Sequence, residues 1–114
     1  MKKNSKKIII FGTGKGGRNI FLIKRKSHNI LAFADNSIPI QKSLFCGKPV
    51  INPNDINKLD FDDVIIASQF FHDICFQLIK LNVPTEKITL VQRDLLVGAP
   101  HKRKSVQKIV LIFF

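Results

Sequence analysis

The sequence lacks tryptophan and tyrosine, and its aromatic residues are ten phenylalanines. Without a phenol group, every mechanism in which tyrosine transfers a proton or attacks a substrate is excluded. The two cysteines, Cys46 and Cys75, stand far apart and form no Cys-x-x-Cys pair. Two such thiols are typical of an intracellular domain in which both stay reduced. No apolar run approaches the roughly 20 residues that span a bilayer, so we expect a cytoplasmic protein.

Acidic residues are scarce: eight Asp and Glu stand against 19 Lys and Arg, which gives a net charge of +11. The excess of positive charge lies at the two ends, because residues 1–26 and 100–114 contain no acid. Such charge runs are typical of solvated tails that aid solubility. Binding of nucleic acid or of an acidic membrane surface through these ends is the alternative interpretation.

Short, continuous apolar runs alternate with helical patterns along the chain. The apolar runs predict strands at 6–12, 29–35, 48–52, 62–68 and 87–91. The remaining patterns predict helices at 16–26, 52–59 and 69–82, and a loop at 37–47. Uninterrupted apolar strands separated by helices indicate an α/β domain with three layers, a mostly parallel sheet with helices on both faces.

The chain divides into one domain and two basic tails. We expect a tail at 1–5, the α/β domain at 6–98 and a second tail at 99–114, in which 107–114 is a candidate for an added strand. Within the domain, Pro49 places its strand near an edge of the sheet. Asn52 and Pro53 supply the cap and the first position of the helix that follows.

The helix expected at 69–82 has a clear apolar face, which consists of Phe71, Ile74, Cys75, Leu78 and Leu81. Phe70 and Phe76 do not share this face. Core packing, contact with the C-terminal tail and contact with another subunit all remain open for these two side chains.

A glycine-rich turn follows the first predicted strand, in the stretch IIIFGTGKGGRNI at 8–20. Gly12, Gly14 and Gly17 form the pattern Gly-x-Gly-x-x-Gly between a strand and a helix, and Asp35 ends the next strand. In this context Gly12 permits the tight turn, Gly14 lets the backbone approach a phosphate, and Gly17 lets the helix pack closely. The helix N-terminus offers free N–H groups to an anion, and Asp35 offers acceptors to ribose hydroxyls.

The candidate nucleotide-binding residues follow three predicted strands. They are Gly12, Thr13, Gly14, Lys15, Gly16, Gly17, Arg18, Asp35, Asn36, Ser68 and Gln69. Lys15 and Arg18 either neutralise a diphosphate or point to solvent. Ser68 and Gln69 lie at the carboxyl edge, where open α/β sheets bind ligands, although Ser68 also suits the cap of the next helix.

Other interpretations compete for the same turn. The simplest is that the glycines only shape the connection between strand and helix. A P-loop fits the separation of Gly12 and Gly17 but is disfavoured, because Arg-Asn stands where that loop needs Lys and Ser or Thr. An S-adenosylmethionine site also fits the spacing of Gly12, Gly14 and Gly16, but the chain is short for a methyltransferase of that kind. No spaced partner for a metal site or a catalytic triad accompanies any of the three histidines, His28, His72 and His101.

Five segments, taken in order, resemble a known family. IIIFGTGKGGRNI, ILAFADN, FCGKPVINP, DDVIIAS and LNVPTEKI are similar to the small Rossmann-like domain of bacterial surface-polysaccharide enzymes. This domain precedes sugar acetyltransferases of the sialic-acid and bacillosamine type, and membrane-bound nucleoside-diphosphate-sugar epimerase/dehydratases. The resemblance implies a Rossmann-like fold and a nucleotide site with three parts: the diphosphate at Gly12, Gly14 and Gly17, the ribose or sugar at Asp35 and Asn36, and the floor at Ser68.

The sequence also departs from these relatives. It has neither the hexapeptide repeats of the acetyltransferases nor the tyrosine that the epimerases use with a lysine for hydride chemistry. We therefore expect a module that binds a nucleotide, NAD(P) or a nucleotide-sugar, and whose chemistry comes from a separate catalytic subunit. Two alternatives stay open: an NAD-dependent sugar-nucleotide oxidoreductase or epimerase subunit completed by self-association as a homodimer, and an interaction protein that uses its basic ends.

Overall fold

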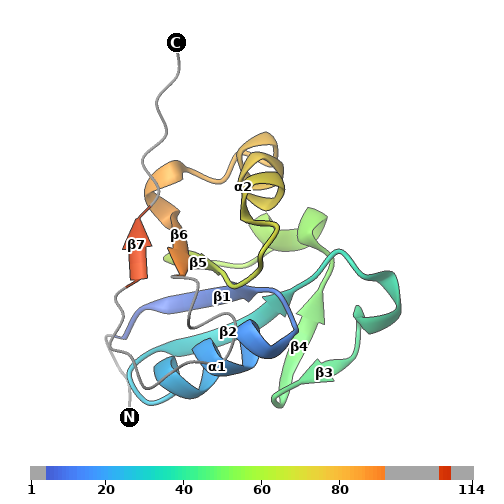
Figure 1. The fold of residues 1–114 in the computed structure, drawn as a ribbon, viewed down its shortest axis with the longest axis vertical. Helices are drawn as coiled ribbons and strands as arrows, with labels where there is room; N and C mark the ends of the chain where they lie inside the picture. The colour runs from blue at the N-terminus through green and yellow to red at the C-terminus, as the bar shows by residue number, and fades with distance from the viewer. Residues whose placement is uncertain (1–4, 92–105, 109–114) are drawn as a thin grey trace.

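The computed structural model describes residues 5–91 and the backbone of 106–108. These residues form one sheet with helices on both faces (Figure 1), so the expected three-layer α/β architecture is confirmed. The basic tails expected at 1–5 and 99–114 fall almost entirely outside the described residues. Only the short strand at 106–108 overlaps the run that was a candidate for an added strand.

The sheet has seven strands: β1 (Lys7–Phe11), β2 (Asn29–Ala34), β3 (Leu44–Phe45), β4 (Lys48–Ile51), β5 (Asp63–Ile66), β6 (Ile88–Val91) and β7 (Val106–Lys108). Their order across the sheet is β3-β4-β2-β1-β5-β6-β7. The inner strands run parallel, while the outer β3 and β7 pair antiparallel with β4 and β6. Uninterrupted apolar strands suit such a sheet, because both of its faces are covered.

The chain reverses its direction of travel across the sheet at β1. From β1 it moves to β2 and β4 on one side, and it then returns to β5 and β6 on the other side. Gly12, Asp35 and Ala67 directly follow the carboxyl ends of β1, β2 and β5. The crevice at such a reversal is the place where open α/β sheets bind ligands.

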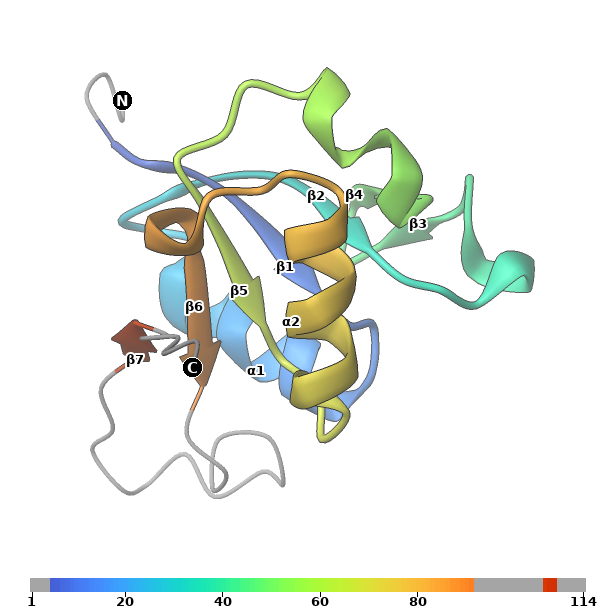
Figure 2. The ribbon, with the colours of Figure 1, turned by 90° about the horizontal axis from the view of Figure 1, so that it is seen from above.

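Two α-helices cover opposite faces of the sheet (Figure 2), α1 (Lys15–Lys24) and α2 (Phe71–Lys80). Successive residues of β1 alternate between the two faces, as an extended strand requires. Ile8 and Ile10 pack in the core cluster on the α1 side, and Ile9 and Phe11 pack in the cluster on the α2 side. None of the helices in the described part of the chain has the length and apolar character needed to cross a membrane.

The segment 37–47 was expected to be a loop, and for its last part that prediction was wrong. It contains a 3₁₀ turn, η1 (Ile38–Ile40), and the strand β3, which pairs with β4. The turn between these two strands lies at Cys46 and Gly47, whose φ angles are 53° and 78°. Positive φ at both central residues is the geometry of a type I′ hairpin turn. The dipeptide Cys-Gly is a weaker sequence signal for this turn than Asn-Gly, which explains why the sequence did not predict β3.

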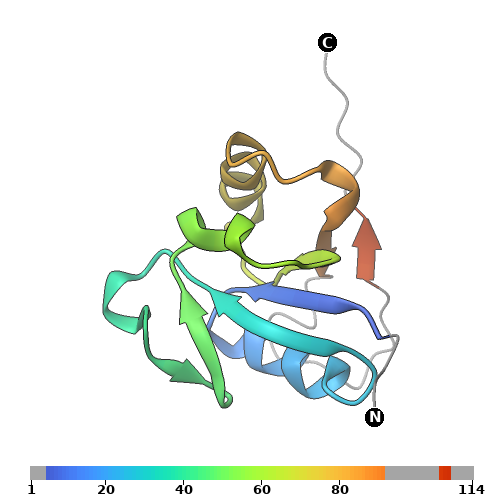
Figure 3. The ribbon, with the colours of Figure 1, turned by 180° about the vertical axis from the view of Figure 1, so that it is seen from behind.

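The segment expected as a helix at 52–59 forms a 3₁₀ helix, η2 (Pro53–Lys58). As predicted, Asn52 caps this helix, because its side-chain oxygen accepts the Asn54 N–H at 2.8 Å. Ile56 of η2 packs in the core cluster of α2, so η2 and α2 lie on the same side of the sheet (Figure 3). A further 3₁₀ turn, η3 (Thr85–Lys87), leads into β6.

Candidate functional site

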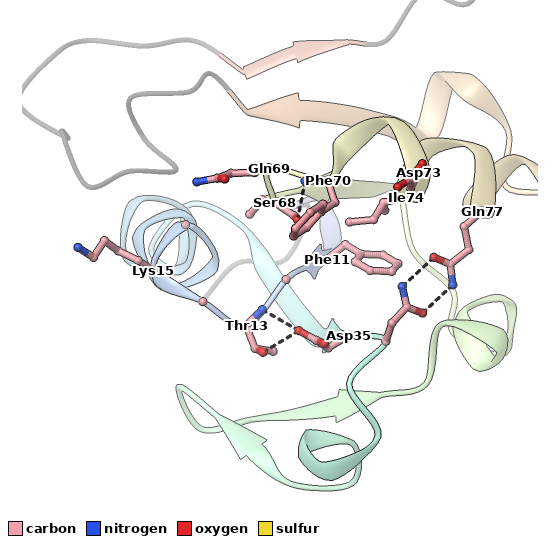
Figure 4. A pocket seen from close by; sticks show the side chains of 15 residues that line it. Phe11, Thr13, Lys15, Asp35, Ser68, Gln69, Phe70, Asp73, Ile74 and Gln77 are labelled. Atoms are coloured by element: carbon pink, nitrogen blue, oxygen red, sulfur yellow. Dashed lines mark hydrogen bonds between the residues drawn. The ribbon is translucent and has the colours of Figure 1, made fainter.

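A cleft of about 580 Å³ opens at the carboxyl ends of β1, β2 and β5 (Figure 4). Its volume lies in the range of pockets that bind small molecules. The lining residues come from the glycine turn, the end of β2, the end of β5 and the start of α2: Phe11, Gly12, Thr13, Gly14, Lys15, Gly16, Asp35, Asn36, Ala67, Ser68, Gln69, Phe70, Asp73, Ile74 and Gln77.

The structure brings together all the predicted site residues except two. Gly17 is buried behind the cleft, where α1 meets the end of β1. Arg18 points elsewhere, with its guanidinium carbon 5.3 Å from the centre of the Phe45 ring. Lys15 and Gln69 line the cleft, but Figure 4 shows both side chains extending away from its centre.

The three glycines of the Gly-x-Gly-x-x-Gly pattern, Gly12, Gly14 and Gly17, differ in what the structure requires of them. Gly12 has a φ of 123°, and a Cβ there would lie 2.7 Å from the carbonyl oxygen of Ala67. A Cβ on Gly17 would overlap the carbonyl oxygen of Gly12. Gly14 is different, because its φ of −92° suits any residue and nothing lies within 4 Å of the place of its Cβ. The protein itself therefore requires glycine at two of these positions, but not at Gly14.

The N-terminus of α1 faces the cleft without a cap. Gly14 occupies the N-cap position, no side chain accepts a hydrogen bond there, and the first turn holds no acid. The first intrahelical bond at this end runs from the Arg18 N–H to the Gly14 carbonyl at 3.0 Å. The N–H groups of the first turn thus have no intrahelical acceptor. Together with the helix dipole, they form an environment that favours an anion.

Asp35 connects the glycine turn to the end of β2. Its Oδ2 accepts the Thr13 N–H at 3.1 Å and the Thr13 hydroxyl at 2.7 Å, and its Oδ1 accepts the Ser37 N–H at 2.8 Å. An ionised carboxylate has about four acceptor positions. Protein groups already fill both positions of Oδ2 and one of Oδ1, so Asp35 has little capacity left for the ribose hydroxyls it was expected to bind.

Asn36 is paired with Gln77 of α2 across the cleft. The Asn36 amide nitrogen donates to the Gln77 side-chain oxygen at 2.9 Å, and the Gln77 amide nitrogen donates to the Asn36 side-chain oxygen at 2.8 Å. This two-bond amide pair fixes the end of β2 against α2. Each amide keeps one N–H and one acceptor position for other partners.

The first turns of α2 supply a wall of the cleft that sequence analysis missed. Phe70, Asp73 and Gln77 line the cleft, and Phe70 remains 71% exposed. The helical spacing of these three residues could have indicated this wall, because they lie together on a side of the helix next to the predicted apolar face of Phe71 and Ile74. Phe70 itself is the N-cap residue, and the Ser68 hydroxyl accepts its N–H at 3.1 Å just before the helix begins.

No metal centre is formed within residues 5–91, where no three His, Cys, Asp or Glu side chains gather closely enough to hold an ion. His28 interacts with the Ser27 hydroxyl at 2.7 Å, and the His72 ring lies 4.4 Å from that of Phe71. His101 lies outside the described residues.

Comparison with known proteins adds a family and a fold. A family model described as C2185-like, N-terminal matches residues 4–89. No curated protein matches the chain. A UDP-D-quinovosamine 4-dehydrogenase from Vibrio fischeri is similar in structure, with a TM-score of 0.72, 21% sequence identity, and coverage of 94% of this chain and 95% of that one.

Two structures of the protein RSP are more distant. The complex with β-NADH has a TM-score of 0.55 at 14% identity and covers 69% of this chain and 43% of the other. The complex with β-NAD+ and operator DNA has a TM-score of 0.56 at 14% identity and covers 75% of this chain and 49% of the other. At these identities the likenesses show the fold, which is Rossmann-like, as the sequence predicted.

Proposed function

The chain belongs to the C2185-like, N-terminal family, and we propose that it is a module that binds a nucleotide-type ligand at its glycine turn. The N–H groups at the start of α1 hold the diphosphate, and the wall formed by β2 and α2 holds the ribose or sugar. The ligand classes are nucleoside diphosphates, their sugar esters and NAD(P).

The observation on which this proposal rests is the open space in front of Gly14. Gly12 and Gly17 are explained by close contacts within the protein, whereas Gly14 has neither a positive φ nor a neighbour within 4 Å. A glycine that only shaped the turn would show one of these features. Glycine at this position leaves the uncapped helix N-terminus accessible, so that the backbone can approach a phosphate directly.

The setting we propose is bacterial surface-polysaccharide biosynthesis, with a nucleotide-sugar as the ligand. The UDP-D-quinovosamine 4-dehydrogenase named above supports this class, because its likeness extends over 94% of this chain and its name specifies a UDP-linked sugar. The resemblance of five segments to the N-terminal domains of sugar acetyltransferases and epimerase/dehydratases points the same way. In this proposal the module binds, and a separate catalytic subunit supplies the chemistry.

A thermal-shift panel tests the proposal with UDP, UDP-glucose, UDP-N-acetylglucosamine, NAD+, NADH, coenzyme A and S-adenosylmethionine. A ligand at 100 times its dissociation constant stabilises the native state by about 2.7 kcal/mol, which is a shift of several degrees in a domain of this size. The Gly14→Val variant meets no neighbour in the protein, so it should remain folded but lose the shift. Absence of any shift, or an equal shift in Gly14→Val, would contradict the assignment.

A second candidate is an NAD-dependent dehydrogenase that acts on a sugar nucleotide. It is favoured by one observation, that the similar structures include a UDP-sugar dehydrogenase and an NADH complex. The protein would be mixed with NAD+ and UDP-N-acetylglucosamine, and NADH would be followed by its absorbance. Formation of NADH in proportion to protein concentration supports catalysis, whereas binding without NADH formation supports the binding module.

A further inference from the structure

We infer that Asp73 of α2, rather than Asp35, is the acid that binds the vicinal hydroxyls of the sugar ring next to the diphosphate. This inference rests on the proposed function, because it names the side chain that reads the ligand in the same site. It also extends the site along α2, beyond the glycine turn.

The first step is that Asp35 is already engaged. Its two carboxylate oxygens accept three hydrogen bonds from Thr13 and Ser37, as described above. A vicinal diol that donates two hydrogen bonds needs two free acceptor positions in suitable directions. Asp35 retains one such position, on Oδ1, and its main role is to hold the glycine turn against the end of β2.

The second step is that Asp73 is free and faces the site. Its side chain is exposed, and within residues 5–91 no hydrogen bond or ion pair engages its carboxylate. Asp73 lines the main cleft and also a second cleft of about 450 Å³. Both of its oxygens are therefore available to hydroxyl groups, and charge-assisted hydrogen bonds are the strong kind.

The third step concerns the orientation of α2. Gln77 follows Asp73 by one helical turn, so the two side chains lie on the same helical face. The amide pair between Gln77 and Asn36 holds this face toward the end of β2. Asp73 and Gln77 line both clefts, which makes the two clefts neighbours along α2; the second is lined by Asn54, Asp73, Phe76, Gln77, Lys80 and Leu81.

The positive end of α1 and the negative charge of Asp73 determine which part of the ligand lies at each end of the site. A carboxylate repels phosphate, so the diphosphate belongs at the uncapped N-terminus of α1, away from Asp73. The hydroxyl-bearing ring attached to the phosphate then reaches α2, where Asp73 accepts its hydrogen bonds. Two rings carry suitable hydroxyls, the ribose of the nucleotide and the hexose of a nucleotide-sugar.

The test compares UDP, 2′-deoxy-UDP and UDP-glucose by titration calorimetry on the wild type and on Asp73→Asn. If the ribose diol binds Asp73, the wild type prefers UDP over 2′-deoxy-UDP by roughly tenfold, and Asp73→Asn removes this preference. If the hexose binds there, the advantage of UDP-glucose over UDP disappears instead. In either case one probe lacks the contacting hydroxyl: 2′-deoxy-UDP if the ribose binds Asp73, or UDP if the hexose does. This probe should bind Asp73→Asn as well as the wild type or more tightly, because the charge that repels its phosphates is gone.

Asp60→Asn is the matched control, since Asp60 is an exposed acid whose side chain is 93% accessible and pairs with Lys7. This variant loses the same charge outside both clefts, so its affinities should equal those of the wild type. Equal effects of Asp73→Asn on all three probes, or none on any, would overturn the role of Asp73 while leaving nucleotide binding intact. Failure of the wild type to bind any of the three probes would overturn this inference together with the nucleotide-sugar setting of the proposed function, whereas NAD(P) binding is decided by the thermal-shift panel.

Asp73 also lies in the first turn of α2, where an acid stabilises the helix dipole. Thermal unfolding of Asp73→Asn without ligand measures this structural role separately. A purely structural role would lower the melting temperature but leave the differences between the three probes as in the wild type, and that result would also overturn the inference.

Discussion

Thr13 donates two hydrogen bonds to the same oxygen of Asp35, from its backbone N–H at 3.1 Å and from its hydroxyl at 2.7 Å. The two residues stand 22 positions apart, so this contact closes the glycine turn onto the end of the next strand. The carboxylate that the sequence suggested for ribose binding thus also has a structural role in this turn. It holds the turn in the shape that exposes the first N–H groups of α1.

The hydroxyl of Thr13 should stabilise the turn measurably. Thr13→Val keeps the shape of the side chain but removes the hydroxyl donor, so one acceptor position of the part-buried Asp35 loses its partner. We expect a loss of about 1 kcal/mol in the free energy of unfolding, measured with urea. Thr13→Ser is the control, because it keeps the hydroxyl. A Thr13→Val variant as stable as Thr13→Ser would show that this bond contributes nothing.

Alanine substitutions should separate the glycines of the turn by their effects on stability. Gly12→Ala places a side chain at a φ of 123° and 2.7 Å from the Ala67 carbonyl oxygen, so we expect a loss of about 2 kcal/mol or more. Gly14→Ala meets no neighbour and suits its φ angle, but alanine is a poorer N-cap residue than glycine, so we expect a change of less than about 1 kcal/mol. Urea denaturation of both variants gives the comparison, and a Gly14→Ala loss as large as that of Gly12→Ala would contradict the geometry.

Much of the fold was predictable because its signals are local. The apolar run of β1, the glycines that follow it and the helical pattern of α1 are continuous in the sequence. Asn52 and Pro53 likewise specify the start of η2 within two adjacent residues. In each case the interactions that set the conformation come from near neighbours along the chain, which a single sequence displays.

The rest of the site depends on contacts that a single sequence does not display. Asn36 pairs with Gln77, which stands 41 positions away, and the occupied state of the Asp35 carboxylate follows from its distance to Thr13. Arg18 turns from the cleft to the Phe45 ring because the β3–β4 hairpin places that ring beside α1. The sequence shows that these residues are polar or charged, but the tertiary fold determines which partners they contact.

Phe70 should contribute to ligand binding without contributing much to stability. Its side chain lines the cleft while 71% exposed, so a planar base or a sugar ring can pack on it. Stacking of a base on an aromatic side chain is worth about 1–3 kcal/mol. Phe70→Ala should therefore weaken UDP binding by about tenfold in calorimetry, with an unchanged urea midpoint.

Leu44→Ala is the matched control for Phe70→Ala. Leu44 is 72% exposed and lines neither of the two clefts described above. Leu44→Ala removes an exposed apolar side chain comparable to that of Phe70, so this variant should keep the UDP affinity and the stability of the wild type. Equal UDP affinity in the wild type, Phe70→Ala and Leu44→Ala would exclude Phe70 from the binding surface.

The thiol of Cys75 should make the stability of the protein depend on pH in the alkaline range. Burial raises the pKa of this thiol above its ordinary value of 9.0, because the charged thiolate is poorly solvated in the core. Below pH 9 the thiol is neutral in both the folded and the unfolded state, so its contribution is fully present. As pH rises past 9 the unfolded state loses its proton first, and the free energy of unfolding falls until the folded thiol also ionises.

Lysine side chains titrate in the same pH range, so the Cys75 contribution has to be measured as a difference. Urea unfolding of the wild type and of Cys75→Ala from pH 7 to pH 10.5 should give a smaller alkaline loss in the variant. Cys46→Ser is the control, because Cys46 is only half-buried in the β3–β4 turn and this variant keeps the buried Cys75 thiol. It should therefore retain the pH dependence of the wild type. If the free energies of unfolding of the wild type and Cys75→Ala fell in parallel with pH, the Cys75 thiol would ionise as easily in the folded protein as in the unfolded chain.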